Sequence, residues 1–144
     1  MNCYAFALNP RRRPRTPRFH DDPNCFSYEA LQKLGKQGVE WDWIKERNSL
    51  RYLSRIKNGD RIVIYNTQGD LVVKGFAEAI QDFHISLGSG RPCVRIKATD
   101  KAKRRVERAA VSRLKEGKGP RQLSVFPITK EDYGQIRRLA GLPA

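Results

Sequence analysis

The 144-residue sequence is poor in the residues from which catalytic and metal sites are usually built. It has two histidines and three cysteines, and the cysteines are widely spaced with no CxxC pair. Such spacing argues against a disulfide framework and a zinc site, and is typical of a reducing compartment. We therefore interpret Cys3, Cys25 and Cys93 as small buried apolar side chains. The sequence predicts no metal site and no cofactor.

Long apolar runs are also missing. No run approaches the roughly 18 residues that a membrane span needs. The N-terminal order is apolar first and basic afterwards, the reverse of a secretory signal. We expect a cytoplasmic protein without a membrane partner. A hydrophobic fraction of 39% with 31% charged residues is typical of a globular chain, and the length suits one domain over residues 1–144.

The common catalytic motifs do not occur. There is no GxSxG, GxxxxGK[ST], HExxH or GxGxxG. His20-Asp21-Asp22 could bind a cation, but adjacent loop residues seldom converge on one metal, so we interpret them as a solvated loop. Asp60 and Asp70 both lie in turn sequences. No cysteine has a nearby candidate base. The sequence therefore predicts a protein that is not an enzyme.

Positive charge is abundant and clustered. Lys and Arg number 29 against 15 Asp and Glu, a net charge of +14. Five arginines fall between residues 11 and 18, and nine Lys or Arg with two Glu fall between 101 and 121. Such clustering predicts binding to a polyanion, for which nucleic acid is the natural candidate. The predicted phosphate-binding residues are Arg11, Arg12, Arg13, Arg15, Lys103, Arg104, Arg105 and Arg108.

The order of elements predicts an α+β fold. Strands are expected at 4–8, 62–65, 71–79, 93–98 and 123–127, helices at 27–34, 101–116 and 129–139, a turn or short helix at 48–53, and a short strand or irregular segment at 38–46. Ser27, Asn48 and Thr129 are the candidate helix N-caps. Without βαβ alternation, a small and strongly curved mixed sheet with helices around it fits best.

Aromatic side chains form the most informative pattern. Trp41 and Trp43 alternate, so both indoles can line one side of an extended segment. Stacking on such rings is worth roughly 1–3 kcal/mol to a nucleobase, and polar groups must then read the base edge. Filling a small core is the simpler interpretation, and composition alone favours it. The candidate base-binding residues are Phe6, Trp41, Trp43, Asn48, Tyr65 and Ser124.

Two stretches resemble the EVE domain family. WDWIKERNSLRYLSRIKNGDRIVIYNT, residues 41–67, resembles its central signature: Trp-Asp, Arg-Asn-x-Leu-Arg, a Gly-Asp turn and a hydrophobic strand ending in Tyr. RQLSVFPITKEDYGQI, residues 121–136, resembles the closing segment and final helix. The ordered matches run from Cys3 to about Ile136. The opening differs, because Ala7-Leu8-Asn9 stands where members often carry Lys-Ser-Glu.

The resemblance implies a PUA-like pseudo-barrel of five to six strands, related to YTH readers. It also implies a non-catalytic domain that holds a nucleobase of DNA or RNA, often a modified one, in an aromatic pocket. Trp41, Trp43 and Tyr65 would stack on the base, with Phe6 behind them. The Arg- and Pro-rich loop at 11–24 would be an inserted phosphate-binding arm, unless it is only a tether.

Two other classes of protein stay open. One is an ASCH-type RNA-processing nuclease, which would need a general base, and His84 and Asp60 are the candidates. The other is a basic protein that binds structured RNA by shape alone.

Overall fold

The structure, a computed structural model, describes residues 1–8, 26–67, 69–115 and 123–144. The loop predicted at 11–24, with four of the predicted phosphate-binding arginines, lies outside the described residues. The strands are β1 (Cys3–Leu8), β2 (Val39–Trp41), β3 (Arg61–Asn66), β4 (Val73–Ala79), β5 (His84–Ile85), β6 (Pro92–Lys101) and β7 (Val125–Ile128). The helices are α1 (Tyr28–Lys33), α2 (Arg47–Leu53), α3 (Ala109–Ser112) and α4 (Lys130–Leu139), with 3-10 turns η3 (Gly35–Gln37) and η4 (Arg113–Lys115).

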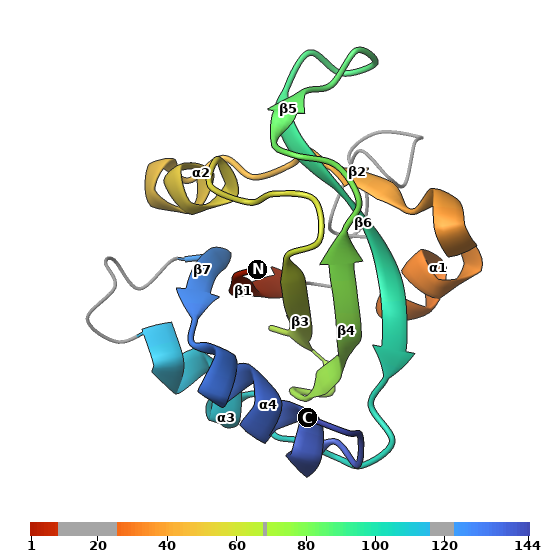
Figure 1. Ribbon diagram of the computed structural model, residues 1–144, viewed down its shortest axis with the longest axis vertical. Coiled ribbons are helices and arrows are strands. Elements are labelled where there is room, and N and C mark those ends of the chain that lie inside the picture. The colour runs from red at the N-terminus through yellow and green to blue at the C-terminus, as the bar shows by residue number, and fades with distance from the viewer. Residues whose placement is uncertain (9–25, 68, 116–122) are drawn as a thin grey trace.

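The strands form one mixed sheet that curls into a half-barrel (Figure 1). Its order is β2-β6-β4-β3-β1-β7, and β5 pairs with β6 beside this path. The β1–β3 pair is parallel, whereas the other pairs are antiparallel. The predicted α+β class with a curved mixed sheet is confirmed.

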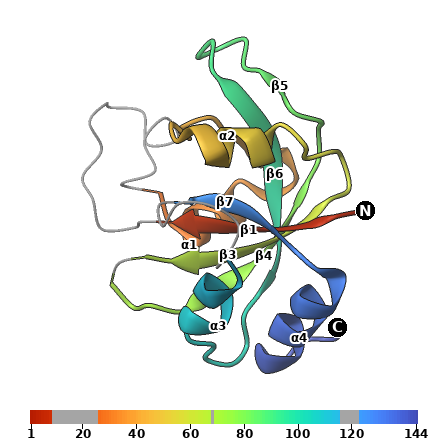
Figure 2. The ribbon, with the colours of Figure 1, turned by 90° about the vertical axis from the view of Figure 1, so that its left-hand side faces the viewer.

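Hydrophobic side chains pack against both faces of the sheet. Side chains alternate along β3, so Ile62 and Ile64 enter one cluster while Val63 and Tyr65 enter the other. We call the first the Trp-side core, because it contains Trp41; residues of α1 and α2 complete it. The second, the Tyr-side core, includes residues of α3 and α4. Figure 2 shows α2 above, and α3 and α4 below, strands β1 and β7.

Local signals place most helix starts correctly. The Ser27 hydroxyl accepts the N–H of Ala30 at 3.1 Å, and the Thr129 hydroxyl accepts that of Asp132 at 3.0 Å, so both predicted N-caps are confirmed. The prediction for α2 was wrong by two residues, because Glu46 occupies the N-cap position in place of Asn48. None of the helices in the described ranges is long and apolar enough to cross a membrane.

The helix predicted over 101–116 is largely wrong. Strand β6 continues to Lys101, and only α3 and the 3-10 turn at 113–115 are helical. The Lys74 carbonyl accepts the N–H of Ala102, and the Ala140 carbonyl accepts those of Lys103 and Arg104. These tertiary hydrogen bonds tie the segment to β4 and to the end of α4, and they override its helical composition.

The turn at Asn58-Gly59-Asp60 fastens the N-terminus to the sheet. Gly59 has φ +95°, a left-handed conformation that favours glycine. The Asp60 side chain is 3% exposed. One carboxylate oxygen accepts the N–H of Asn2 and the other accepts that of Lys57, each at 2.9 Å. Asp60 therefore holds the starts of β1 and β3 together.

Replacing Asp60 by Ala should destabilise the protein by about 2–4 kcal/mol, because two backbone N–H groups lose a charged acceptor. Urea denaturation measures this loss. Asp70→Ala is the matched control, since Asp70 is exposed and pairs with Arg105 at the surface. That control should cost no more than about 1 kcal/mol. Equal losses in the two variants would contradict the clamping role of Asp60.

Candidate functional site

Four aromatic rings from separate parts of the chain meet in the Trp-side core. Phe6 lies on β1, Phe26 precedes α1, Trp41 ends β2 and Trp43 follows it. The ring centroids are 4.4 Å apart for Trp41 and Trp43, 5.2 Å for Phe6 and Trp41, and 5.6 Å for Phe26 and Trp43. Trp41 is fully buried, whereas Trp43 is 7% exposed. The structure thus brings together Phe6, Trp41 and Trp43, and it adds Phe26, which no local sequence pattern had indicated.

The indole nitrogen of Trp41 is the unusual polar atom of this cluster. Nε1–H is buried, and no described residue offers it an acceptor. A buried donor without a partner costs about 1–3 kcal/mol and calls for an explanation. An acceptor atom on a ligand, such as a ring nitrogen or carbonyl oxygen of a base, would satisfy it. The cluster therefore combines buried rings that pack against one another, in place of the open aromatic pocket that was expected, with one unused hydrogen-bond donor.

Asn48 lies on α2 and Ser124 directly precedes β7, and these two elements pack against each other. Asn48 accepts a hydrogen bond from Arg51 at 2.8 Å. The Ser124 hydroxyl donates to the Glu46 carboxylate at 2.6 Å, and the Ser124 backbone N–H donates to the buried hydroxyl of Ser49 at 2.8 Å. The Ser124 hydroxyl proton is thus already engaged, so this side chain can meet a ligand only as an acceptor. Sequence reasoning missed Ser49 and Glu46, which hold Ser124 in place.

Tyr65 does not join the tryptophans. It belongs to the Tyr-side core, where its ring lies 6.4 Å from that of Phe126. Burial raises the pKa of its hydroxyl to about 12. The prediction of one wall shared by Tyr65 and Trp41 is therefore corrected. The residue lies in β3 as expected, one position before the strand ends at Asn66, but the two-residue period of the strand turns it to the opposite face of the sheet.

The basic residues after β6 also lie on the Tyr-side core. Lys103, Arg104 and Arg105 are exposed, and Arg108 is half-buried. Arg105 forms ion pairs with Asp70 at 2.9 Å and Glu107 at 2.7 Å, so part of its charge is already balanced. Their neighbours Ala102, Val106 and Ala110 pack into the Tyr-side core. This basic segment and the aromatic cluster are therefore on different sides of the sheet.

The arginine-rich segment lies outside the described residues, but the described residues that flank it in sequence do not. Leu8 is the last described residue before it and Phe26 is the first after it, and both side chains belong to the Trp-side core, as Trp41 does.

The model of the family described as EVE domain matches residues 19–139. The chain belongs to the EVE domain family. The resemblance read from the sequence is thereby confirmed. None of the curated proteins compared with this EVE domain matches it.

Several solved structures have a fold similar to that of this chain. Human THYN1 in complex with 5-methylcytosine-containing DNA is 17% identical with a TM-score of 0.76, and the match covers 100% of both chains. Atu2648 from Agrobacterium tumefaciens is 22% identical with a TM-score of 0.75, covering 99% of this chain and 94% of that one. The Mmi1 YTH domain is 14% identical with a TM-score of 0.54, covering 97% and 76%. These likenesses show that the EVE domain has the predicted PUA-like fold.

Proposed function

We propose that this EVE domain binds nucleic acid without cutting it and holds one modified nucleobase at the Trp41–Trp43 cluster. The observation that carries the proposal is the meeting of four aromatic rings, one of which, Trp41, has a buried indole N–H that lacks an acceptor in the described residues. The net charge of +14 supports a polyanionic partner. The family adds support, because THYN1, of the same fold, was solved with 5-methylcytosine-containing DNA.

We propose a different role for each tryptophan. Trp43 keeps some exposure, so it is the ring that an incoming base meets first. A base reaches it only after leaving its own stack, as in other proteins that extrude a nucleotide. Stacking on Trp43 contributes roughly 1–3 kcal/mol. Trp41 is fully buried next to it, and we expect its unpartnered N–H to donate to an acceptor atom of the base.

His84 and Asp60, the candidate general bases of a nuclease, are engaged in other contacts. Both carboxylate oxygens of Asp60 accept backbone N–H groups, so this side chain has a structural role. His84 lies on β5 and its ring contacts Glu40 and the Asp82 carbonyl. Neither residue belongs to the aromatic cluster in the described part of the chain. A reader that positions a base is therefore the better supported function.

The test is a comparison of paired oligonucleotides that differ only in one modified base, in single-stranded and duplex DNA and RNA. The wild-type protein should bind one modified oligonucleotide more tightly than its unmodified twin. Trp43→Ala should lose about tenfold or more of that preference, because a stacking surface is removed, while most salt-dependent affinity remains. Fluorescence anisotropy at a fixed salt concentration measures both quantities.

Trp43→Phe is the matched control, because it keeps an aromatic face at the same position. It should retain most of the preference that Trp43→Ala loses, and circular dichroism verifies that both variants are folded. A wild-type protein that binds all pairs equally would overturn the proposal and favour a shape-specific RNA-binding protein. Cleaved oligonucleotide after incubation would favour the nuclease.

A further inference from the structure

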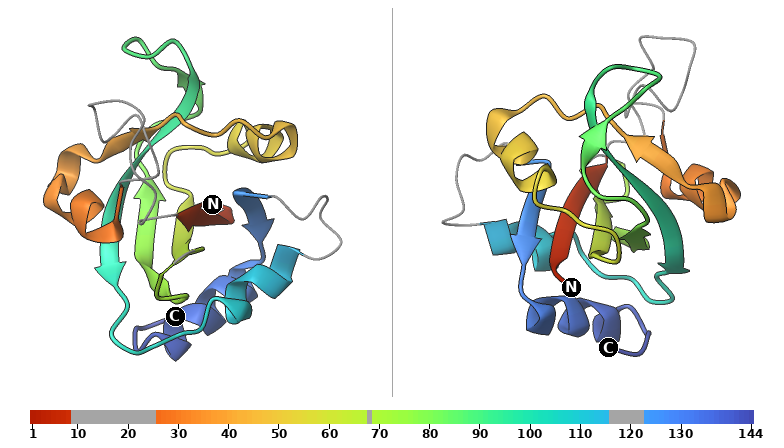
Figure 3. Two further views of the ribbon diagram at one scale, coloured as in Figure 1. Left: turned by 180° about the vertical axis from the view of Figure 1, so that it is seen from behind. Right: turned by 45° about the horizontal axis from the view of Figure 1, so that its top comes forward.

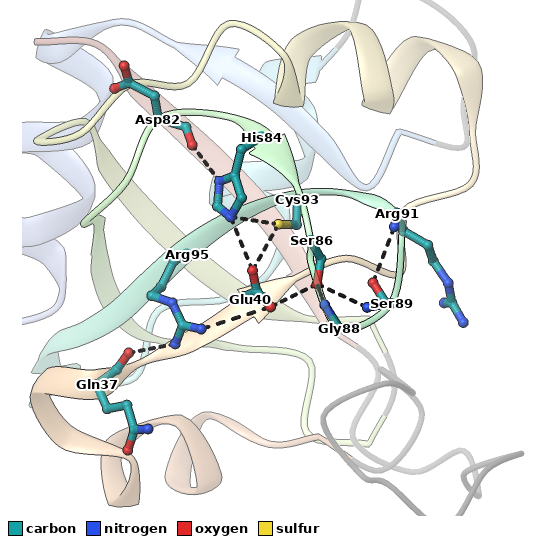
Figure 4. A network of polar contacts seen from close by, with 10 residues as sticks. All are labelled: Gln37, Glu40, Asp82, His84, Ser86, Gly88, Ser89, Arg91, Cys93 and Arg95. Atoms are coloured by element: carbon teal, nitrogen blue, oxygen red, sulfur yellow. Dashed lines mark hydrogen bonds and ion pairs between the residues drawn. The ribbon is translucent and has the colours of Figure 1, made fainter.

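A second group of polar side chains lies at the end of the sheet, away from the aromatic rings. Glu40 is on β2, His84 on β5 and Cys93 on β6 (Figure 4). The antiparallel register pairs His84 directly with Cys93, and it pairs Glu40 with Arg95, two residues along β6. Direct partners, and residues two apart on a strand, share a face of the sheet. The three side chains therefore converge by register rather than by sequence spacing.

The donor atoms of this group are already close. Glu40 Oε2 lies 3.1 Å from His84 Nε2 and 3.5 Å from Cys93 Sγ, and Sγ lies 3.3 Å from Nε2. Around a tetrahedral zinc ion, with its usual bond lengths, sulfur, nitrogen and oxygen donors stand about 3.3–3.6 Å apart. An ion would thus have to spread the three atoms by only a few tenths of an ångström.

Outer hydrogen bonds aim the ligand atoms at one point. The Asp82 carbonyl lies 2.8 Å from His84 Nδ1 and accepts its N–H, which directs Nε2 toward the group. The Ser86 hydroxyl donates to Glu40 Oε1 at 2.9 Å, which leaves Oε2 facing His84 and Cys93. The same hydroxyl accepts the N–H groups of Gly88 and Ser89. Partners of this kind orient the ligands in most protein metal sites.

We propose that Glu40, His84 and Cys93 bind a divalent transition-metal ion, for which Zn²⁺ is the best match. One thiolate, one imidazole and one carboxylate form a ligand set that zinc accepts, and the two negative ligands balance its charge. The Cys93 thiol proton passes to solvent when the metal binds. The side chains of His84 and Glu40 are 33% and 25% exposed, so one side of the site is open for a water as fourth ligand.

A nucleophilic cysteine is the competing interpretation of the same group. Cys93 is completely buried. A substrate would have to pass His84 and Glu40 to reach the sulfur. The geometry suits a ligand to an ion better than a nucleophile.

The site would fasten an otherwise slender part of the fold. Strand β5 has two residues, and with the start of β6 it extends beyond the rest of the sheet as an arm (Figures 1 and 3). Ile85 and Leu87 on this arm are exposed. An ion held by Glu40, His84 and Cys93 would join β2 to both strands of the arm. The absence of a CxxC pair had predicted no zinc site, and this proposal departs from that prediction.

Cobalt titration of the full, chelator-treated chain tests the site. Co²⁺ should bind once per chain at this site and give a thiolate-to-cobalt charge-transfer absorption. Cys93→Ser should abolish that absorption, and Glu40→Gln, which keeps the size of the side chain, should weaken Co²⁺ and Zn²⁺ binding at least tenfold. Ser86→Ala should weaken metal binding about 10- to 100-fold, because it removes the hydrogen bond that orients the Glu40 carboxylate. Zn²⁺ should raise the thermal midpoint of the wild type but not that of Cys93→Ser.

The controls are the other sulfur and imidazole ligands of the chain. Cys3→Ser, Cys25→Ser and His20→Ala should leave the absorption unchanged. A folded wild type without the absorption would overturn the proposal, as would an absorption that survives Cys93→Ser but disappears in Cys25→Ser. The outcome is independent of base binding, because neither variant set includes a residue of the aromatic cluster.

Discussion

Gly38→Ala should leave little folded protein. Gly38 has φ +62° and ψ −157°, a conformation that essentially only glycine adopts. A Cβ atom there would lie 2.0 Å from the carbonyl oxygen of Ile96 and 2.8 Å from its carbonyl carbon. Both are backbone atoms of β6, and the next residue, Val39, pairs with Ile96 in the sheet. The clash therefore cannot be relieved by a side-chain rotation and must break the β2–β6 pairing.

The expected loss is about 4 kcal/mol or more, which is large against a total stability of roughly 5–15 kcal/mol. Urea denaturation, or soluble yield where the variant does not fold, measures it. Gly35→Ala is the matched control, because Gly35 also has a positive φ, +57°, but no heavy atom lies within 4 Å of its added Cβ. It should cost only the left-handed strain of about 1–2 kcal/mol. Similar losses in both variants would show that backbone strain, not the contact with Ile96, is decisive.

Features that depend on neighbouring residues could be predicted from the sequence. Ser27 and Thr129 start helices because each hydroxyl meets an N–H three residues later. The alternation of Val94, Arg95, Ile96 and Lys97 identified β6, since a strand with one buried face repeats every two residues. The family could be identified from the sequence because each of its motifs consists of neighbouring residues. Taken in order, these motifs cover most of the chain.

Features that depend on which strands pair could not be predicted. The end of β3 was located, but the sheet face that Tyr65 occupies follows from the register of β3 beside β1 and β4. Glu40, His84 and Cys93 are far apart in sequence, and the pairing of β2 and β5 with β6 is what unites them. Likewise, the backbone hydrogen bonds from Lys103 and Arg104 to Ala140 hold this segment in a non-helical conformation, although its composition favours a helix. In each case the deciding partner is distant along the chain.

Replacing Arg11, Arg12, Arg13 and Arg15 together by Ala should greatly reduce the dependence of nucleic-acid binding on salt. Each phosphate contact contributes a slope of about 0.9 to the fall of log affinity with log salt on duplex DNA. Losing all four contacts should lower the slope by about 3–4. Between 50 and 200 mM salt, the wild type would then lose roughly a hundredfold more affinity than the variant. Anisotropy titrations at several salt concentrations measure the slopes.

The charge-matched control replaces Lys103, Arg104, Arg105 and Arg108 by Ala. Both variants remove four positive charges from a net charge of +14. Arg105 is already paired with Asp70 and Glu107, and the segment packs on the Tyr-side core, across the sheet from Trp41. The control should therefore lower the slope by less than half as much as the arginine-rich variant. A larger decrease of the slope in the arginine-rich variant than in the control would indicate that the protein binds nucleic acid with one face.

Equal decreases of the salt slope in the two variants would contradict the proposed base reader. If every positive charge contributed equally, affinity would depend on the net charge and not on the positions of the charges. This is expected of a protein that binds RNA through its overall electrostatic field. Base recognition requires the strand to be held next to the pocket that receives the base. Leu8 and Phe26, the described residues that flank the arginine-rich segment in sequence, share the Trp-side core with Trp43, so we expect the 11–18 cluster to hold the strand there. The ratio of the two slopes thus measures whether the grip on phosphates and the aromatic cluster act together.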